Sequence, residues 1–289
     1  MANQVLIRHC PIAALMVLVC VIAVYLPETR ADDPSGAIHL TVRWQQHDDD
    51  RAKFSSATAT RDWRSSETAL LICDTWDKHW CTSATRRCDA LARQIAPLVE
   101  QARMHGVHII HAPSDTLEFY RDHPARRRAI DLPMATAPSP IAACPLDAKR
   151  EGALPIDDSD GGCDCEPSCK NVNQRAWTRQ HPAIGIADAD LITDSGQQVY
   201  NYLVHAGIKN VIYVGVHTNM CVLGRSFGIR QMTRLGFNTV LVRDLTDTMY
   251  NPRQRPFVEH AAGTDLVIKH VEQFWCPSTT RVALAEGLR

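Results

Sequence analysis

Short apolar runs alternate with helical patterns from residue 67 onward. Four runs rich in β-branched residues predict strands buried on both faces. They lie at 68–74, 107–111, 211–214 and 238–244. Apolar residues three or four positions apart predict helices between these strands. They lie at 91–104, 191–205 and 221–235. A further short strand is predicted at 265–271, so the alternation of strands and helices indicates an α/β domain.

The first thirty-one residues have the pattern of a secretory signal. Arg8 and His9 precede an apolar run from Pro11 to Leu26, and Thr29 and Ala31 place small residues where signal peptidase cleaves. We predict cleavage after Ala31 and a secreted or periplasmic protein that is not bound to a membrane after cleavage. The alternative is an uncleaved anchor, for which about sixteen apolar residues are short.

The remaining chain divides into an N-terminal extension, residues 32–66, and a main domain, residues 67–289. Alternation from Ile38 to Trp44 predicts an edge strand in the extension. Residues 131–176 are rich in Pro, Asp, Gly and Cys without periodicity, so they are predicted to be an irregular insertion in the main domain. The net charge of −1 gives no basic footprint for nucleic acid, and a small-molecule partner is expected instead.

Nine of the eleven cysteines remain after signal removal, so at least one thiol lacks a partner within the chain. Cys221 is our candidate for this thiol. In the insertion, Cys163, Cys165 and Cys169 lie close together in sequence. They either bind zinc together with Cys144 or form disulfides, and export favours disulfides.

Two residues stand where strands end. Cys221 lies where the strand at 211–214 leads into a helix, so helix-end N–H groups are predicted to lower its thiol pKa and to bind a substrate oxyanion. Asp74 ends the first strand of the main domain, where catalytic side chains gather in parallel sheets, although a helix-capping role is the alternative.

Aromatic and polar residues follow Asp74 directly. Trp76, His79 and Trp80 are predicted to form the wall of a substrate pocket, with a surface loop as the alternative. Asn219, in the turn before Cys221, is also expected to contact substrate. His111, Asp115 and His123 do not match a recognised metal-ligand spacing. No metal or other cofactor is therefore predicted, although a metal site was considered.

The order of these features resembles the isochorismatase-like cysteine hydrolase superfamily, which includes nicotinamidases and N-carbamoyl amide hydrolases. The resemblance covers residues 67–275 apart from most of the insertion, and its strongest segment is Gly215 to Val222 (GVHTNMCV). It implies an α/β fold with a doubly wound parallel sheet of about six strands between two helix layers, Rossmann-like and three-layered, and it implies a homo-oligomer. It also implies a cis peptide bond between Val216 and His217 that orients N–H groups toward an oxyanion.

The resemblance also implies a catalytic triad of Asp, Lys and Cys. Asp74 and Cys221 match two members, but no lysine stands at the third position. Arg179 falls closest and is expected to hold the Asp74 carboxylate without shuttling a proton.

The sequence thus predicts an exported hydrolase that cleaves an amide or carbamoyl C–N bond through a thioester on Cys221. Two alternatives remain. One is acid-catalysed hydrolysis of the isochorismatase type without a nucleophilic cysteine, and the other is a non-catalytic binding protein on the same scaffold.

Overall fold

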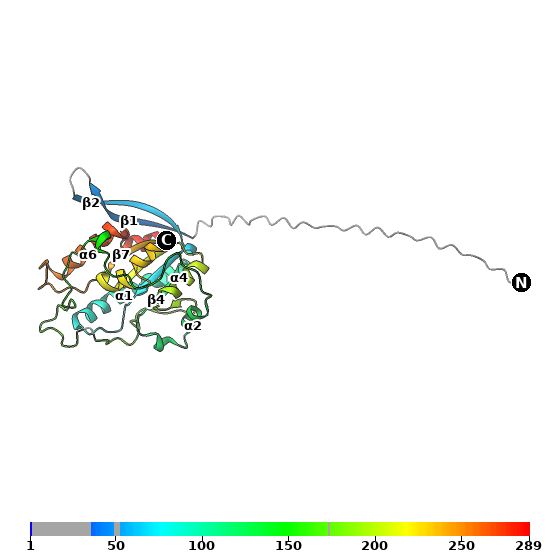
Figure 1. Cartoon of the computed structure of the whole chain (residues 1–289), viewed down its shortest axis with the longest axis horizontal. Coiled ribbons are helices and arrows are strands. Elements are labelled where there is room, and N and C mark those ends of the chain that lie inside the picture. The colour runs from blue at the N-terminus through cyan, green and yellow to red at the C-terminus, as the bar shows by residue number, and fades with distance from the viewer. Residues whose placement is uncertain (2–35, 49–52, 173) are drawn as a thin grey trace. The chain divides into compact units, whose positions relative to one another are not determined.

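The computed structural model describes residues 36–48, 53–172 and 174–289, together with Met1 (Figure 1). The described residues from 36 to 289 form one compact unit. The predicted signal peptide lies outside the described residues apart from Met1. In the described part of the chain, no helix has both the length and the apolar character needed to cross a lipid bilayer.

One eight-stranded sheet runs through the molecule in the order β2-β1-β8-β7-β6-β3-β4-β5. Its strands are β1 (Ala37–Asp48), β2 (Lys53–Arg64), β3 (Thr68–Cys73), β4 (His108–Ala112), β5 (Leu191–Ile192), β6 (Asn210–Val216), β7 (Asn238–Asp247) and β8 (Ser278–Thr279). Strands β3 to β8 are parallel, which confirms the predicted doubly wound sheet. Strands β1 and β2 extend this sheet, since β1 pairs antiparallel with both β8 and β2.

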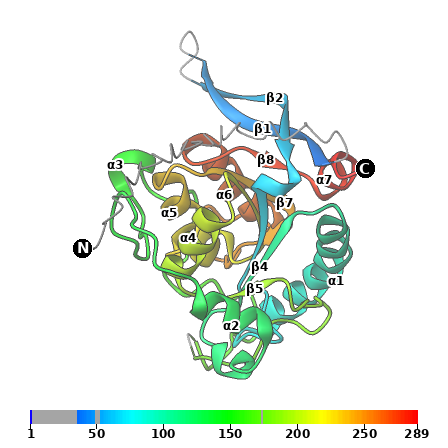
Figure 2. The ribbon, with the colours of Figure 1, turned by 90° about the vertical axis from the view of Figure 1, so that its right-hand side faces the viewer.

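Helices cover both faces of the sheet (Figure 2). They are α1 (Thr82–Met104), α2 (Pro124–Asp131), α3 (Ala148–Glu151), α4 (Gly196–His205), α5 (Ile229–Arg234), α6 (His260–Phe274) and α7 (Arg281–Gly287). Apolar residues of α1 and α7 share one buried cluster with the sheet, and those of α4, α5 and α6 share the other. The predicted three layers are therefore present.

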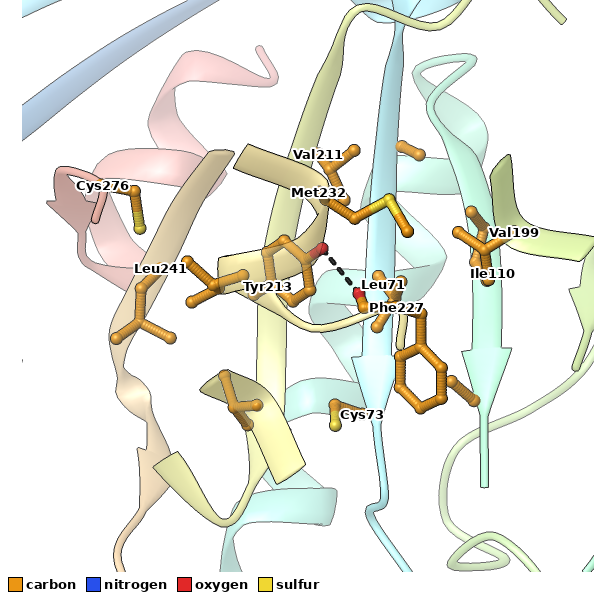
Figure 3. Packing of buried hydrophobic residues seen from close by; sticks show 14 of the residues in the cluster. Leu71, Cys73, Ile110, Val199, Val211, Tyr213, Phe227, Met232, Leu241 and Cys276 are labelled. Carbon is orange, nitrogen blue, oxygen red and sulfur yellow. Dashed lines mark hydrogen bonds between the residues drawn. The ribbon is translucent and has the colours of Figure 1, made fainter. Parts of the chain in front are cut away.

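The burial of the central strand β3 on both faces explains its apolar sequence. Leu70 and Ile72 join the cluster under α1, whereas Leu71 and Cys73 join the cluster under α4, α5 and α6. Every residue of β3 is buried, because alternate side chains of a central parallel strand enter opposite helix layers. Figure 3 shows the second cluster, in which the Tyr213 hydroxyl donates a 2.8 Å hydrogen bond to a backbone carbonyl oxygen.

Two segments differ from their predicted secondary structure. Residues 265–271 lie in α6 and not in a strand, and the buried Val267, Ile268 and Val271 form one helical face. A short apolar run does not distinguish these two states. Leu191–Ile192 is strand β5 and not the start of a helix, since α4 begins only after its N-cap residue Ser195.

The helix predicted from Cys221 is also interrupted. Residues Thr218–Val222 form a π-helical turn, and α5 starts only at Ile229. Ser226, in the segment between this turn and α5, packs tightly against the start of α4. A Cβ added to Gly196 would lie 2.2 Å from the Ser226 carbonyl oxygen. Packing against α4 therefore decides the chain path here, in place of uninterrupted helical periodicity.

The N-terminal extension forms a β-hairpin that joins the sheet. Its first strand, β1, is not the edge strand predicted, because β2 pairs along its outer side. Arg43 of β1 pairs at 2.8 Å with the fully buried carboxylate of Glu272 in α6. This ion pair attaches the hairpin to the main domain.

The insertion is irregular, as predicted. Asp131 is the last residue of α2, and from residue 132 to residue 176 the described residues of the insertion contain only the short helix α3. All nine cysteines from Cys73 onward are free thiols, so the predicted disulfides are not formed.

Glu151 attaches the insertion to the main domain through a buried network. Its carboxylate accepts hydrogen bonds from Arg230 at 2.7 and 2.9 Å, and from Trp275 at 2.7 Å. His270 lies 2.8 Å from the same carboxylate. Burial raises the pKa of Glu151, but the bonds from Arg230 and other donors outweigh burial and lower it to about 2.

We predict that Glu151→Gln destabilises the protein by roughly 3–5 kcal/mol, because it leaves the Arg230 guanidinium buried without a counter-charge. Urea unfolding at pH 7 measures this loss. The wild-type contribution is present above the ordinary glutamate pKa and should be lost as pH falls toward about 2. Glu118→Gln, which removes an exposed pair with Arg121, is the control and should change stability by less than about 1 kcal/mol. Equal effects of the two substitutions would contradict the prediction.

Candidate active site

Asp74 and Cys221 meet at the carboxyl edge of the sheet. Asp74 follows β3 and Cys221 lies in the turn after β6, and these two strands pair in parallel up to Cys73 and Gly215. A Cβ on Gly215 would lie 2.0 Å from the Cys73 carbonyl oxygen, and its φ is +110°. Only glycine therefore allows the two strand ends to approach so closely.

The Asp74 carboxylate is fully buried and has partners on both oxygens. The Ser114 backbone N–H donates to Oδ1 at 2.7 Å, and Arg225 Nε donates to Oδ2 at 3.1 Å. The φ of Asp74 is +45°, an uncommon conformation for a residue with a side chain and one that recurs at functional sites. Burial raises the pKa of Asp74, against the opposing effects of Arg225 and Ser114. A carboxylate with a raised pKa is a stronger base than an ordinary aspartate.

The Cys221 thiol lies within hydrogen-bonding reach of the Asp74 carboxylate. The backbone N–H of His217 lowers the pKa of the Cys221 thiol. The peptide bond between Val216 and His217 is cis, as the family resemblance implies. The structure thus brings together the predicted base, the predicted nucleophile and the predicted cis peptide.

The prediction of a lowered Cys221 pKa is wrong for this arrangement. Burial raises the pKa of the thiol, and the negative charge of Asp74 raises it further. Arg225 and the His217 N–H oppose this rise without cancelling it. The Cys221 thiol therefore keeps its proton at rest, and Asp74 is the candidate base that removes it during reaction with a substrate.

Arg225, and not Arg179, pairs with Asp74. The Arg179 backbone bonds to Asp77, and its guanidinium lies 5.3 Å from the Phe119 ring centroid. The expectation that Arg179 holds the carboxylate is thus corrected. The sequence contained one signal for Arg225, namely its position four residues after Cys221, which places both side chains on one side of a helical turn.

The predicted aromatic wall is packed together beside the cis peptide. The rings of Trp76 and Trp177 stack at 4.1 Å, and His79 stacks on Trp177 at 5.7 Å. Trp80 lies against His79 at 5.0 Å. Trp76 is 3% exposed and donates to the Ser114 carbonyl oxygen. This stack supports the Asp74 loop.

The side chains of His79 and His217 are neutral at pH 7. Burial lowers the pKa of His79 to about 4 and that of His217 to about 3. The His217 Nε2 atom is buried and has no hydrogen-bond partner in the structure.

A pocket of about 410 Å³ opens onto the Cys221 side chain, and its exposed lining is mostly apolar. Its lining residues are Ala143, Cys144, Pro145, Leu146, Leu154, Asn219, Met220, Cys221, Gly224, Arg225 and Arg230. The insertion thus supplies one wall. Of the residues predicted to bind substrate, Asn219 lines this pocket, whereas Trp76, His79 and Trp80 do not.

The histidines considered as metal ligands have other partners. His111 is buried and bonds to Gln180 at 2.9 Å and to Asp190 at 3.0 Å. His123 accepts the Ala125 N–H and caps α2. These contacts give both side chains structural roles.

Searches against protein-family models and curated proteins gave no match. Among solved structures, the chain is similar to a cysteine hydrolase from Pseudomonas syringae pv. phaseolicola 1448A, with 13% identity, a TM-score of 0.48, and coverage of 78% of this chain and 94% of that one. It is also similar to an isochorismatase family protein from Burkholderia thailandensis, with 15% identity, a TM-score of 0.44, and coverage of 77% and 96%. A putative isochorismatase hydrolase from Oleispira antarctica shows 15% identity, a TM-score of 0.45, and coverage of 76% and 97%.

We predict that Asp74→Asn speeds alkylation of Cys221 by iodoacetamide between pH 7 and 9. Removing the carboxylate charge lowers the thiol pKa, and the thiolate fraction rises about tenfold for each unit lost. Peptide mass spectrometry measures the rate at Cys221 separately from the other thiols. Asp77→Asn, which removes a nearby carboxylate bonded to Thr178, is the control and should leave the rate unchanged. A rate at Cys221 unaffected by Asp74→Asn would disprove the coupling.

Proposed function

We propose that this chain is a hydrolase that cleaves an amide or carbamoyl C–N bond of a small molecule through a thioester on Cys221. One observation supports this most: a thiol lies beside a buried carboxylate that is itself held by a guanidinium. A base next to a nucleophile, oriented by a third group, is the general arrangement for covalent catalysis. The pocket of about 410 Å³ at Cys221 suits a small molecule.

In the proposed acylation step, Asp74 takes the thiol proton as the Cys221 sulfur attacks the carbonyl carbon. The negative charge that develops on the carbonyl oxygen is received by backbone N–H groups of the turn at His217 and Cys221. Asp74 then gives its proton to the leaving nitrogen as the C–N bond breaks. An amine leaves, and a thioester remains on Cys221.

In the second step, Asp74 takes a proton from water, and the resulting hydroxide attacks the thioester carbonyl carbon. The C–S bond breaks, the acid product leaves, and Asp74 returns the proton to the sulfur. Arg225 stays charged throughout: burial opposes its charge, but Asp74 outweighs burial and raises the pKa of Arg225. Its role is to hold and stabilise the carboxylate. No cofactor takes part in the reaction as we propose it.

We expect Cys221→Ala to lower kcat/KM by more than about 10³-fold on any substrate found in a screen of small amides and carbamoyl compounds, because the covalent route is lost. Mass spectrometry of acid-quenched wild type should detect an acyl group on the Cys221 peptide that hydroxylamine removes. Cys276→Ala, which removes a buried thiol outside the pocket, is the matched control and should keep activity. Full activity in Cys221→Ser would favour acid catalysis of the isochorismatase type, and no turnover of any compound would favour the binding-protein alternative.

Export completes the proposal. Cleavage after Ala31 should give a mature chain that begins at Asp32, because Thr29 and Ala31 suit signal peptidase. N-terminal sequencing of protein recovered from the medium or periplasm tests this, with Ala31→Arg expected to block processing. An intact N-terminus in wild type would contradict it. Homo-oligomeric assembly, which the family resemblance implies, stays a prediction.

A further inference from the structure

Four cysteine side chains from two distant parts of the chain meet at the start of α1. Cys81 is the N-cap residue of α1, whereas Cys163, Cys165 and Cys169 belong to the insertion. Their four sulfur atoms lie within 4.8 Å of one another. Cys81 and Cys163 are buried, and the other two are partly buried. We call these residues the four-cysteine cluster.

The spacing of the sulfur atoms fits a shared metal ion better than disulfides. The Cys81 and Cys165 sulfurs are 3.7 Å apart, whereas a disulfide requires about 2.05 Å. Four sulfurs placed tetrahedrally about 2.3 Å from a zinc ion lie about 3.8 Å from one another.

We propose that one zinc ion binds at the four-cysteine cluster in a closed structural site ligated by Cys81, Cys163, Cys165 and Cys169. Each thiol releases its proton when its sulfur binds the ion. Four sulfur ligands fill a tetrahedral site, so no position remains for water or substrate, and the ion is structural. The proposal does not depend on the proposed hydrolase activity.

The start of α1 provides hydrogen-bond donors to the sulfurs. The Ser83 backbone N–H donates to the Cys165 sulfur at 3.3 Å, and the Thr82 N–H donates to the Cys169 sulfur at 3.5 Å. The Ser83 hydroxyl lies 3.1 Å from the Cys165 sulfur. These N–H groups have no intrahelical acceptor, and the positive end of the helix dipole favours negative sulfur ligands.

Arg87 balances the charge beside the cluster. The Asp164 carboxylate lies 3.9 Å from the Cys81 sulfur, where it would repel a thiolate. Arg87 pairs with Asp164 at 2.7 Å and with Asp247 at 2.9 Å, and its guanidinium is partly buried. Its single positive charge therefore offsets part of the negative charge of the two carboxylates and of a zinc–tetrathiolate group of net charge −2.

The surface also gives the ion a route to its ligands. Cys165 and Cys169 line a hollow of about 370 Å³, together with Thr82, Ser83 and Arg86. Zinc can therefore reach the two partly exposed sulfurs without unfolding of the main domain.

The proposed ion would hold the insertion against the main domain. The four-cysteine cluster packs with Trp80, Met220 and Met249, and Met220 immediately precedes Cys221. The insertion has almost no secondary structure of its own, and a metal site is a common way to hold such a segment.

Cys144, the fourth ligand considered from the sequence, lies elsewhere. Its sulfur is 2.9 Å from Gln231 Oε1 and 3.2 Å from Arg234 Nη1. Cys144→Ser is therefore a matched control, since it removes a thiol of the same insertion that does not belong to the four-cysteine cluster.

The test uses full mature protein, purified without chelators and with zinc in the growth medium, and measures metal by elemental analysis. Wild type and Cys144→Ser should each hold about one zinc per chain, whereas Cys81→Ser and Cys169→Ser should hold less than about a tenth of that amount. Cys169→His should retain the zinc, since Cys₃His sites also bind it. In wild type, the four thiols should resist alkylation until a chelator is added, and cobalt substitution should give the visible spectrum of a tetrahedral thiolate site.

Four outcomes would overturn the proposal. The first is two disulfides among these cysteines in unreduced wild type, seen as thiols that alkylate only after reduction. The second is four freely alkylated thiols with no metal. The third is zinc that is kept in Cys81→Ser and lost in Cys144→Ser, and the fourth is zinc bound equally in wild type and every variant. The measurements on wild type decide the matter even where a variant fails to fold, and none of them depends on catalysis.

Discussion

The buried carboxylate of Asp74 is the charge on which the candidate active site depends. The carboxylate is buried away from water beside the Cys221 thiol. A carboxylate without a counter-ion at this place would be protonated. Arg225 supplies that counter-ion from the segment that follows the thiol, so one short stretch carries the proposed nucleophile and the cation that opposes the effect of burial on its base. The π-helical turn at 218–222 and the tight packing of 225–228 against α4 hold both side chains toward Asp74.

The same carboxylate decides the state of the thiol. From the sequence, a cysteine at a helix start was expected to ionise easily, since helix-end N–H groups attract negative charge. Burial and a negative neighbour outweigh those N–H groups here and raise the pKa. In the proposed reaction, proton transfer to Asp74 accompanies attack by Cys221, because the thiol is not ionised before the reaction starts.

The sequence predicted the central sheet well, because a strand buried on both faces needs an unbroken apolar run, and β3 and β6 have one. It also placed Asp74 and Cys221 at adjacent strand ends, since parallel strands end at a common edge. The strand predicted at 265–271 was wrong because a helix with one buried face and a short buried strand share the same local composition. Arg179 was chosen by position along the chain, whereas contact with Asp74 depends on how the turn after β6 folds back. That path is set by packing against α4, a contact between distant residues that no local pattern records.

The insertion forms a wall of the pocket although it has no core of its own. It is attached at separate points to elements that carry the candidate site. Glu151 bonds to Arg230 of α5, and the Asp158 carboxylate accepts a 2.7 Å hydrogen bond from Asn219, two residues before Cys221. The four-cysteine cluster adds a third attachment at the start of α1, the helix that follows the Asp74 loop. The order of this wall depends on these attachments, since irregular backbone with little buried apolar surface opens at low free-energy cost. The shape of the pocket therefore depends on polar and sulfur contacts, which are sensitive to pH, metal and redox state in a way that the apolar sheet beneath them is not.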